Sequence, residues 1–310
     1  MDEMPERSDV EAAAARLKGK VMRTPVLSSR LLNERMGVQV FLKCENLQFA
    51  GAFKFRGVMN VISQLSPEER SRGVITHSSG NHAQALALAA KRAGIRATIV
   101  MPEGSNPLKR EATEEHGAHI ISCENTQEAR EQTCQAEIDR SGMVLVHPYD
   151  DARIIAGAGT AARELLEDRP DLDAIVTPVG GGGLLSGTAV AVDGRCPVYG
   201  AEPEGADDAY RGFMSGERVT SQTPHTISDG LRTCLGVLNF QVILARVKGI
   251  GVVTDDETLE AMRWVRFHTS QVIEPSSAVP LAAIRNGSLE VEGKVGVIVS
   301  GGNVDPSLME

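Results

Sequence analysis

The chain has 310 residues, of which 42% are hydrophobic and 24% are charged, so it can bury a sizeable core as one large domain or two smaller ones. Its 32 basic and 41 acidic residues give a formal charge of −9, which argues against a general affinity for nucleic acid. The sequence has no apolar run long enough to cross a bilayer, and its first seven residues lack the layout of a secretory signal. A protein without membrane partners, located in the cytoplasm, is therefore expected.

Short runs rich in β-branched residues alternate with stretches of helical character through most of the chain. Such alternation predicts parallel sheets covered by helices, which is an α/β fold. The predicted strands are residues 38–42, 73–77, 97–101, 118–122, 143–147, 174–179, 197–201 and 295–300.

Lys54 is the first residue in chain order that suggests chemistry. It stands between Phe53 and Phe55, and small residues precede them. Apolar neighbours desolvate an amine and favour its neutral, nucleophilic form, as an imine-forming lysine requires. The alternative is an ordinary surface lysine, because most lysines are exposed.

A second candidate lies where the predicted strand 73–77 runs into a helix. The turn between them offers free backbone N–H groups, a side-chain amide and two hydroxyls, which together can hold a carboxylate. The same residue types are also the usual N-caps of helices, so the pattern alone leaves both interpretations open. The turn consists of Ser78, Ser79, Gly80 and Asn81.

Residues 157–162 match the Gly-x-Gly-x-x-Ala pattern of dinucleotide-binding proteins, ahead of a helix predicted at 160–167. A nucleotide-dependent dehydrogenase is therefore a rival interpretation, although a lone match is weak. The next predicted strand ends in Pro178 and Gly180 without an acidic residue to bind a ribose, and Ile154-Ile155 is too short for a first strand.

Four consecutive glycines, residues 180–183, connect the hydrophobic strand 174–179 to an apolar helix. Consecutive glycines allow successive amides to turn toward a phosphate at the positive end of the helix. A flexible linker is also glycine-rich, but linkers seldom join a buried strand to an apolar helix. Ser300 ends the last predicted strand in the same way, and ligands of open α/β sheets bind at that end of the strands.

These motifs, in this order from about Thr24 to Asn303, resemble fold-type II pyridoxal phosphate enzymes. The nearest group contains the serine racemases, serine/threonine dehydratases and hydroxyaspartate ammonia-lyases, within the tryptophan synthase β-like family. The resemblance implies two open parallel-type sheets, a homodimer, and a small mobile domain at 76–148. That domain is inserted into a large cofactor-binding domain made of 1–75 and 149–310, with the active site in the cleft between them.

The resemblance also implies roles for single residues. Lys54 forms the imine with pyridoxal phosphate, Phe53 lines the ring and Asn81 contacts the 3-hydroxyl. Ser300 meets the pyridine nitrogen, and a neutral serine there leaves that nitrogen largely unprotonated, which favours expulsion of a β-substituent. The phosphate is bound by Gly180, Gly181, Gly182, Gly183 and Leu184.

The turn after the predicted strand 73–77 reads Ser-Ser-Gly-Asn-His, as in serine racemases and hydroxyaspartate ammonia-lyases, whereas threonine deaminases usually have alanine at the second position. The resemblance implies that Ser79 exchanges the α-proton on the cofactor face opposite Lys54. Ser78, Ser79, Gly80, Asn81 and His82 would bind the substrate.

Arg130 lies where related racemases carry an arginine at the active-site mouth. It would clamp a second substrate carboxylate, as in 3-hydroxyaspartate. It is equally compatible with a solvated helix residue in the run Gln-Glu-Ala-Arg-Glu. Tyr149 stands where racemases often have asparagine, which leaves the identity of the substrate open.

An acidic segment resembles the divalent-cation site of the same group. The resemblance implies that Glu202, the carbonyl of Ala206 and Asp208 would bind the ion. Oxygen ligands suit Mg²⁺, and Ca²⁺ or Mn²⁺ would also be accepted. Without the resemblance, an acidic surface loop is the plainer interpretation.

The predicted function is elimination from a hydroxy amino acid, of the serine/threonine dehydratase type, with associated serine racemase activity. The alternative within the group is a 3-hydroxyaspartate ammonia-lyase. A third possibility is a catalytically silent ligand-binding protein that keeps the fold. Bound pyridoxal phosphate would colour the enzyme yellow, whereas a silent relative without the cofactor is colourless.

Overall fold

The structure, a computed structural model, describes residues 3–308 and contains two β-sheets. The larger sheet has six strands in the order β1-β2-β10-β7-β8-β9, and the smaller has four in the order β5-β4-β3-β6. All paired strands are parallel except β1 and β2. The predicted α/β fold with two parallel-type sheets is therefore confirmed.

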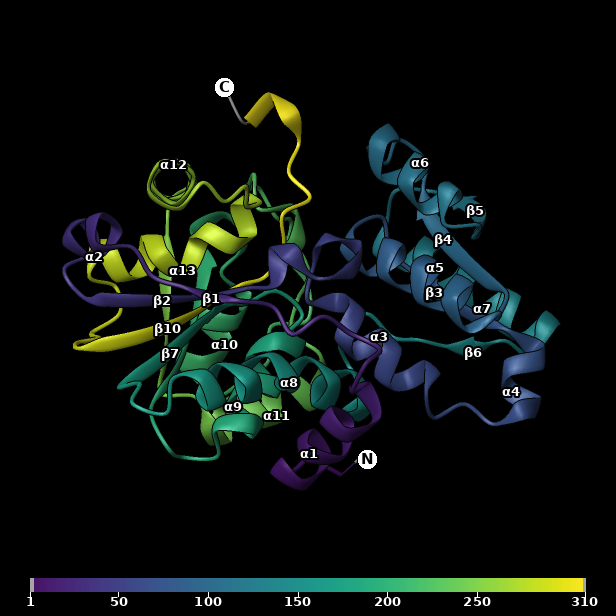
Figure 1. Cartoon of the computed structure of the whole chain (residues 1–310). Coiled ribbons are helices and arrows are strands. Elements are labelled where there is room, and N and C mark those ends of the chain that lie inside the picture. The colour runs from purple at the N-terminus through teal and green to yellow at the C-terminus, as the bar shows by residue number, and fades with distance from the viewer. Residues whose placement is uncertain (1–2, 309–310) are drawn as a thin grey trace.

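Helices surround both sheets, and the two parts of the molecule lie side by side (Figure 1). The strands are β1 (Val26–Leu27), β2 (Gln39–Cys44), β3 (Val74–His77), β4 (Ala97–Pro102), β5 (His119–Cys123), β6 (Val144–Leu145), β7 (Ala174–Pro178), β8 (Val198–Pro203), β9 (Gly249–Val253) and β10 (Lys294–Val299). The helices are α1 (Arg7–Leu17), α2 (Arg30–Met36), α3 (Lys54–Ile62), α4 (Pro67–Arg72), α5 (Asn81–Ala93), α6 (Pro107–Glu115), α7 (Gln127–Ser141), α8 (Ala152–Asp168), α9 (Gly183–Val192), α10 (Asp208–Ser215), α11 (Val237–Arg246), α12 (Asp255–Thr269) and α13 (Pro275–Asn286). None of these helices combines the length and hydropathy needed to span a bilayer.

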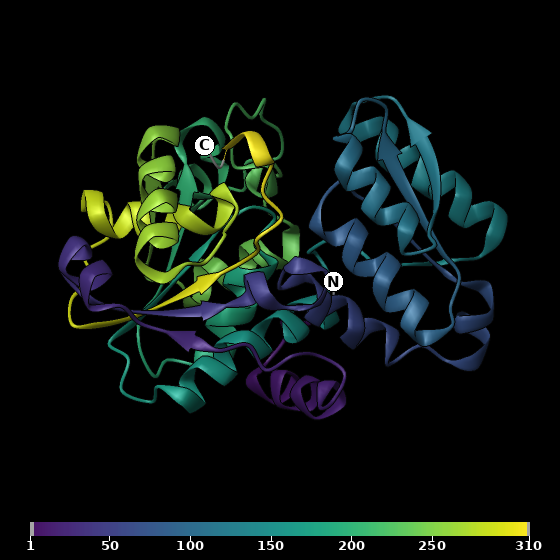
Figure 2. The ribbon, with the colours of Figure 1, turned by 45° about the horizontal axis from the view of Figure 1, so that its top comes forward.

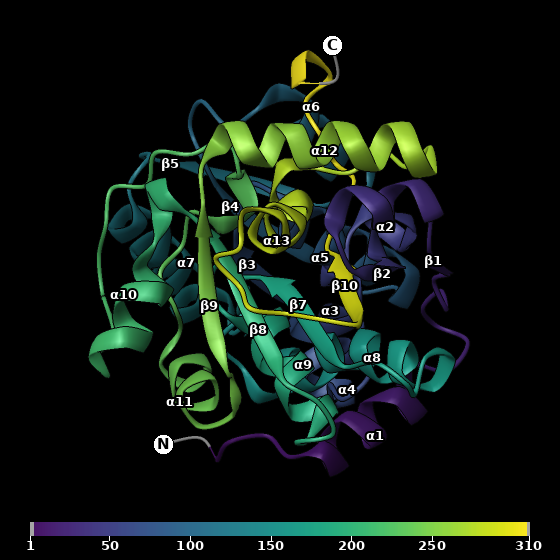
Figure 3. The same cartoon turned by 90° about the vertical axis from the view of Figure 1, so that its left-hand side faces the viewer.

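Both faces of the larger sheet are covered, which explains why its central strands are apolar along their whole length. Helices α12 and α13 lie on one face and α8 and α9 on the other (Figure 3). The side chains of β10 alternate accordingly: Val297 belongs to the cluster under α13, whereas Ile298 belongs to the cluster under α9.

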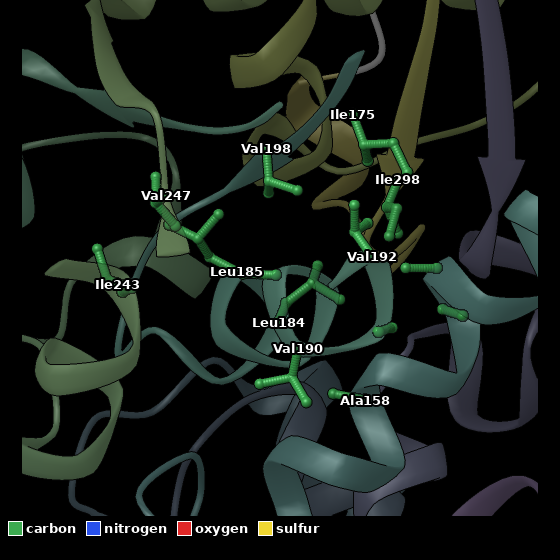
Figure 4. Close-up of a cluster of buried hydrophobic side chains, with 14 of the residues drawn as sticks. Ala158, Ile175, Leu184, Leu185, Val190, Val192, Val198, Ile243, Val247 and Ile298 are labelled. Atoms are coloured by element: carbon green, nitrogen blue, oxygen red, sulfur yellow. The ribbon is translucent and has the colours of Figure 1, made fainter. Parts of the chain in front are cut away.

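Helix α9 is fixed by one of these clusters. Its Leu185 lies toward Val198 and Val247, while Val190 lies next to Ala158 of α8 (Figure 4). Burying a leucine or valine side chain stabilises the fold by roughly 1.5–3 kcal/mol. The helix that follows the glycine run therefore has a rigid base.

The smaller sheet forms a separate layer system built from residues 74–145 (Figure 2). Leu86 of α5 packs on one face with Ile99 of β4, and Cys134 of α7 packs on the other with Val100. The predicted boundary at residue 76 falls inside β3. Residues 1, 2, 309 and 310 of the predicted large domain lie outside the described part of the chain, and movement of a domain at 76–148 stays a prediction.

The Gly-x-Gly pattern at 157–159 lies inside α8, which begins eight residues earlier than the predicted helix. A Cβ on Gly157 would come within 2.6 Å of the Gly57 Cα, and one on Gly159 within 2.5 Å of the Gly187 carbonyl oxygen. These glycines allow α8 to pack closely against α3 and α9. The dinucleotide-binding interpretation is therefore wrong, because no strand-to-helix turn exists at this position.

A buried ion network lies beneath α3. The guanidinium of Arg56, which is 0% exposed, donates to both carboxylate oxygens of Glu45 at 2.7 and 2.8 Å and to Glu164 at 2.8 Å. Lys43, also fully buried, donates to Glu164 and to the Thr24 carbonyl, both at 2.7 Å. The network joins β2, α3 and α8, so it fixes the helix that Lys54 begins.

Candidate active site

The segment before Lys54 is held against the carboxyl end of β10. Ala50 and Gly51 adopt left-handed backbone conformations with φ of 57° and 68°. The Asn303 amide donates to the Ala50 carbonyl at 2.9 Å, and the Phe53 N–H donates to the Ser300 carbonyl at 2.9 Å. These contacts start α3 at Lys54, beside the turn that follows the sheet.

Lys54 is half-buried, and its Nζ donates to the Pro148 carbonyl at 2.8 Å. Burial lowers its pKa from 10.5 to about 8, although the charge of Glu274 opposes the shift. Nζ lies 5.1 Å from the centroid of the Phe53 ring. An amine with this pKa is partly neutral near physiological pH, as a nucleophilic lysine requires, and the catalytic role of Lys54 stays a prediction.

The turn from Ser78 to Gly80 links β3 to α5. The Ser78 N–H donates to the Val100 carbonyl at 3.1 Å, and the Gly80 N–H donates to the Ser78 Oγ at 3.3 Å. The N-cap of α5 is Gly80, and no side-chain hydrogen bond caps this helix in the described structure. The start of α5 thus keeps its anion-binding character, whereas the ordinary serine-cap interpretation does not hold.

The side chain of Asn81 joins the small sheet system to the large one. Its Nδ2 donates to both carboxylate oxygens of Glu274 at 2.9 Å, and its Oδ1 accepts from Asn303 at 3.0 Å. Burial and the charge of Asp229 raise the pKa of Glu274 to about 7, although Asn81, Lys109 and Lys54 oppose the shift. Glu274 is absent from the sequence predictions because a glutamate before a proline resembles an ordinary helix start.

His82, predicted to bind substrate, is buried in the first turn of α5. Its Nε2 lies 3.0 Å from the Val146 carbonyl oxygen. Burial keeps its pKa well below 6.5, so the ring is neutral and donates this bond. The side chain therefore holds the segment that carries Pro148, the hydrogen-bond partner of Lys54.

The glycine run is buried and packs closely against neighbouring residues, so it is not a flexible linker. A Cβ on Gly181 would come within 2.3 Å of the Tyr149 ring, and one on Gly182, whose φ is +94°, within 2.7 Å of the Asn239 Cβ. Helix α9 begins at Gly183. Backbone amides at a helix start can bind a phosphate, and this role of the glycine run stays a prediction.

Ser300 lies buried directly after β10, and its Oγ is 2.9 Å from the Oγ of Ser277 in α13. The same end of the sheet is linked to the glycine run, because the Gly230 N–H donates to Ser276 while its carbonyl oxygen packs against Gly180. The lysine, the glycine run and the serine hydroxyl thus come from distant segments but meet at one edge. The strand ends predict this meeting for the glycine run and Ser300, whereas the place of Lys54 is an expectation from the family resemblance.

Arg130 lies in α7, where its Nε donates to the Thr126 carbonyl at 3.2 Å. Its charge acts on His77 at the end of β3: burial, His147 and Arg130 all lower the pKa of His77, to about 4, although Glu131 opposes them. The His147 ring stands edge-on to the rings of His77 and Tyr149, at 5.8 and 4.8 Å between centroids. Burial raises the pKa of Tyr149 to about 12.

The predicted cation ligands lie at the end of β8. Glu202 is fully buried and accepts from the Tyr210 N–H at 2.8 Å, and Asp208 accepts from the Leu235 N–H at 3.0 Å. Burial raises the pKa of both carboxyl groups, that of Glu202 also through the charge of Asp208. The described residues contain no cluster of three His, Cys, Asp or Glu able to hold a metal, so carbonyls and water would have to complete the site.

The geometry fits pyridoxal phosphate. The glycine run leads into the positive end of α9, and its backbone N–H groups carry no side chains of their own. Lys54 supplies an amine with a lowered pKa, and Ser300 supplies a buried hydroxyl. The phosphate, the aldehyde and the ring nitrogen of that cofactor would each find a matching group here: a helix start, an amine and a hydroxyl.

Comparisons with known proteins agree with this fit. Residues 17–301 match the family described as "Pyridoxal-phosphate dependent enzyme". Over 307 residues the chain is 47% identical to L-threo-3-hydroxyaspartate ammonia-lyase of Saccharomyces cerevisiae (97% of this chain, 94% of the relative) and 45% identical to serine racemase of Dictyostelium discoideum (96% and 95%). The structure of maize serine racemase superposes with a TM-score of 0.96 at 40% identity, covering 99% of this chain and 96% of that one. The chain therefore belongs to the pyridoxal-phosphate dependent enzyme family.

Proposed function

We propose that this protein removes the β-hydroxyl and the amino group from a hydroxy amino acid, giving a 2-oxo acid and ammonia, and that it also racemises serine. The observation that carries the proposal is Lys54, an amine with a lowered pKa beside both an anion-binding helix start and a glycine cradle. The names of the two relatives, a hydroxyaspartate ammonia-lyase and a serine racemase, support the same two reactions.

The glycine run with Leu184 would hold the phosphate through backbone N–H groups, while Phe53 lines the ring and Asn81 contacts the 3-oxygen. Pyridoxal phosphate supplies an aldehyde that takes up the substrate amine and a ring that withdraws electrons from the α-carbon. The half-buried site around Lys54 limits the access of water, which keeps its Nζ partly neutral. That Nζ then accepts the α-proton.

The substrate carboxylate would bind at Ser78–Asn81 and the backbone of His82, where the first turn of α5 offers N–H groups without a side-chain cap. Ser79 Oγ would exchange a proton on the face opposite Lys54 Nζ. Two such groups on opposite faces permit racemisation, whereas loss of the β-hydroxyl before reprotonation gives the oxo acid. One proton abstraction thus leads to two products.

A 3-hydroxyaspartate ammonia-lyase is the second candidate. Arg130 favours it, because its positive charge acts on His77 at the end of β3, next to the turn that would bind the first carboxylate. A guanidinium there can pair with the second carboxylate of a dicarboxylic substrate. Glu131 opposes such a substrate, since its negative charge acts on His77, His147 and Tyr149.

A divalent cation, preferably Mg²⁺ and otherwise Ca²⁺ or Mn²⁺, would bind Glu202, the Ala206 carbonyl and Asp208. Two buried carboxylates have raised pKa values although Arg211 acts on Asp208, and a cation would supply further compensating charge. This site would stabilise or activate the enzyme without touching the substrate.

We also propose a homodimer in the cytoplasm, with residues 76–148 closing over the substrate. Leu47 and Val272 are exposed apolar side chains on neighbouring segments, because the Asn46 amide donates to the Val272 carbonyl. Their closeness supports an interface between copies of the chain. Phe267, which is 82% exposed, precedes Val272 by a few residues in the sequence. Light scattering of wild type and Phe267→Glu tests the assembly.

The deciding experiment is product analysis with L-serine, D-serine, L-threonine and the diastereomers of 3-hydroxyaspartate, with Mg²⁺ present. Dominant oxo acid from one substrate would identify it as that substrate's ammonia-lyase, and appreciable D-serine from L-serine would identify a racemase. Colourless purified protein that gains no yellow band with added pyridoxal phosphate would instead favour the silent ligand-binding alternative.

A further inference from the structure

The chain returns from the small sheet system through a short strap, residues 147–150, that contacts Lys54. The Pro148 carbonyl accepts from Lys54 Nζ at 2.8 Å, and among residues 3–308 this amine makes no other hydrogen bond. Proline has no N–H of its own, so the place of its carbonyl depends on the residues beside it. The orientation of the Lys54 amine therefore depends on how the strap is held.

The His147 ring shapes the strap from within. Its Nδ1 accepts from the Tyr149 N–H at 3.3 Å and from the Asp150 N–H at 2.8 Å. A ring nitrogen that accepts two N–H groups carries no proton, so this ring is neutral with its hydrogen on Nε2. Burial lowers the pKa of His147 and favours that form. These bonds close the turn around Pro148, but they do not attach it to the large sheet system.

Two side chains, Asp150 and Asn239, make that attachment and are called the clamp here. The Asp150 carboxylate accepts from the first two N–H groups of α11 at 2.8 and 3.0 Å. It takes the place of an N-cap side chain, because the N-cap residue of α11 is Gly236. A Cβ on Gly236 would lie 2.3 Å from the Asp150 Oδ1. The Asn239 amide, which is 0% exposed, donates to the Tyr149 carbonyl at 3.0 Å.

We propose that Asp150 and Asn239 are positioning residues: they fix the strap on α11, so that the Pro148 carbonyl holds the Lys54 amine in one orientation while it takes up and returns the substrate α-proton. A carbonyl that accepts from this amine also favours its charged form once the proton is taken up. The inference rests on Lys54 as the base in the proposed function.

Position and charge of Asp150 are separated by two variants. Asp150→Ala removes both, whereas Asp150→Asn removes the charge but keeps an oxygen that accepts from α11. The groups that share the electrostatic surroundings of Lys54 are Glu274, His82 and His147, and both variants leave them in place. The Asp150 charge raises the pKa of His147, so its loss favours the neutral ring that the strap needs.

The test is a titration of Lys54 in the full chain without cofactor, with lysine labelled by carbon-13 next to Nζ. The signal that is missing in Lys54→Met belongs to Lys54. Loss of a helix N-cap shifts an equilibrium by roughly threefold to thirtyfold. In Asp150→Ala the buried amine loses its fixed acceptor, so the ratio of charged to neutral Lys54 at a given pH falls by that factor. Asp150→Asn gives a smaller fall.

A second variant keeps the test decisive where Asp150→Ala does not fold. Asn239→Leu removes the other attachment of the strap at nearly constant size and without any change of charge. The ratio of charged to neutral Lys54 falls in this variant as well.

In the holoenzyme, Asp150→Ala lowers kcat for L-serine by a similar factor and leaves KM near that of the wild type. The reason is that Asp150 acts on the base and not on the turn that would bind the carboxylate. Asp151→Ala is the matched control, because this neighbouring carboxylate caps α8 through the Arg153 N–H, at 2.7 Å. It leaves the Lys54 titration and kcat unchanged.

An unchanged Lys54 titration in Asp150→Ala and Asn239→Leu would overturn the inference. A midpoint that rises toward 10.5 would do the same, since it would show entry of water rather than loss of an acceptor. Equal falls in Asp150→Ala and Asp150→Asn would overturn it too, because they would show a direct effect of charge. A shifted titration in a protein that turns over no amino acid would refute the proposed function while supporting the hold of the clamp on Lys54.

Discussion

Removal of Arg56 tests whether the network beneath Lys54 holds the site in place. In Arg56→Met, Glu45 keeps the Thr24 hydroxyl, at 2.5 Å, and a long contact to the Gln48 amide at 3.5 Å. Glu164 keeps only Lys43 as a charged partner. Both carboxylates remain buried, and together they face one positive charge instead of two.

The expected cost follows from that imbalance. Removing one partner of a buried ion pair destabilises a protein by about 3–5 kcal/mol, because the remaining charge stays desolvated. At about 2 °C per kcal/mol, typical of large domains, the melting temperature falls by roughly 6–10 °C. Since Lys54 begins the same helix two residues earlier, affinity for pyridoxal phosphate falls as well.

Thermal and urea unfolding of the protein without cofactor measure the loss, and Arg23→Met provides the control. Arg23 also bonds two carboxylates, Glu167 at 2.7 Å and Asp168 at 2.5 Å, but its side chain is 50% exposed. A surface arginine of this kind contributes about 1 kcal/mol or less. Equal losses in the two variants would refute the argument, as would a double variant Glu45→Gln/Arg56→Met that regains no stability over Arg56→Met.

Four further predictions concern the site. Lys54→Ala abolishes turnover and the yellow band, measured by product assay and absorbance. Ser79→Ala suppresses racemisation and use of D-serine more than elimination from the L-substrate, so equal losses would count against two opposed bases. Gly181→Ala weakens cofactor binding about tenfold, because its Cβ would lie 2.3 Å from the Tyr149 ring, whereas Gly183→Ala, with 3.3 Å of clearance, weakens it less in the same titration. The pKa of Glu274 is raised from 4.5 to about 7, so the folded protein without cofactor retains a proton that the unfolded chain releases. The stability that this group contributes is present below pH 4.5 and declines by about 3 kcal/mol as the pH rises through 7. In urea unfolding, Glu274→Gln removes this pH dependence.

The fold follows closely from local sequence where strands are long and apolar. All eight predicted strands occur, with ends displaced by a few residues. The two strands without a prediction carry weak signals: β1 has only two residues, and β9 contains Gly249 and Gly251, which lower strand propensity. Helix α8 shows the opposite error, because glycines that serve close packing against Gly57 and Gly187 resemble a nucleotide-binding turn.

The site divides in the same way. Lys54 and the glycine run can be predicted as candidate site residues because their neighbours in the sequence indicate their chemistry. Glu274 and Asp150 cannot, because their meaning comes from partners far along the chain: Asn81 is 193 residues from Glu274, and Val237 is 87 from Asp150. These carboxylates acquire their roles only from tertiary contacts.

The side chain of Asn81 gives the predicted movement of the small domain a physical consequence. Its hydrogen-bond partners, Glu274 and Asn303, both belong to the other part of the molecule. Asn303 also holds the Ala50 carbonyl before Lys54, and the Glu274 N–H bonds the Gly301 carbonyl after Ser300. A small domain that opens must break the hydrogen bonds of Asn81 and so release the two side chains that contact the segments around the cofactor site. Binding of a substrate carboxylate at the start of α5 would therefore also order the groups around the cofactor, which links recognition of the substrate to the readiness of Lys54.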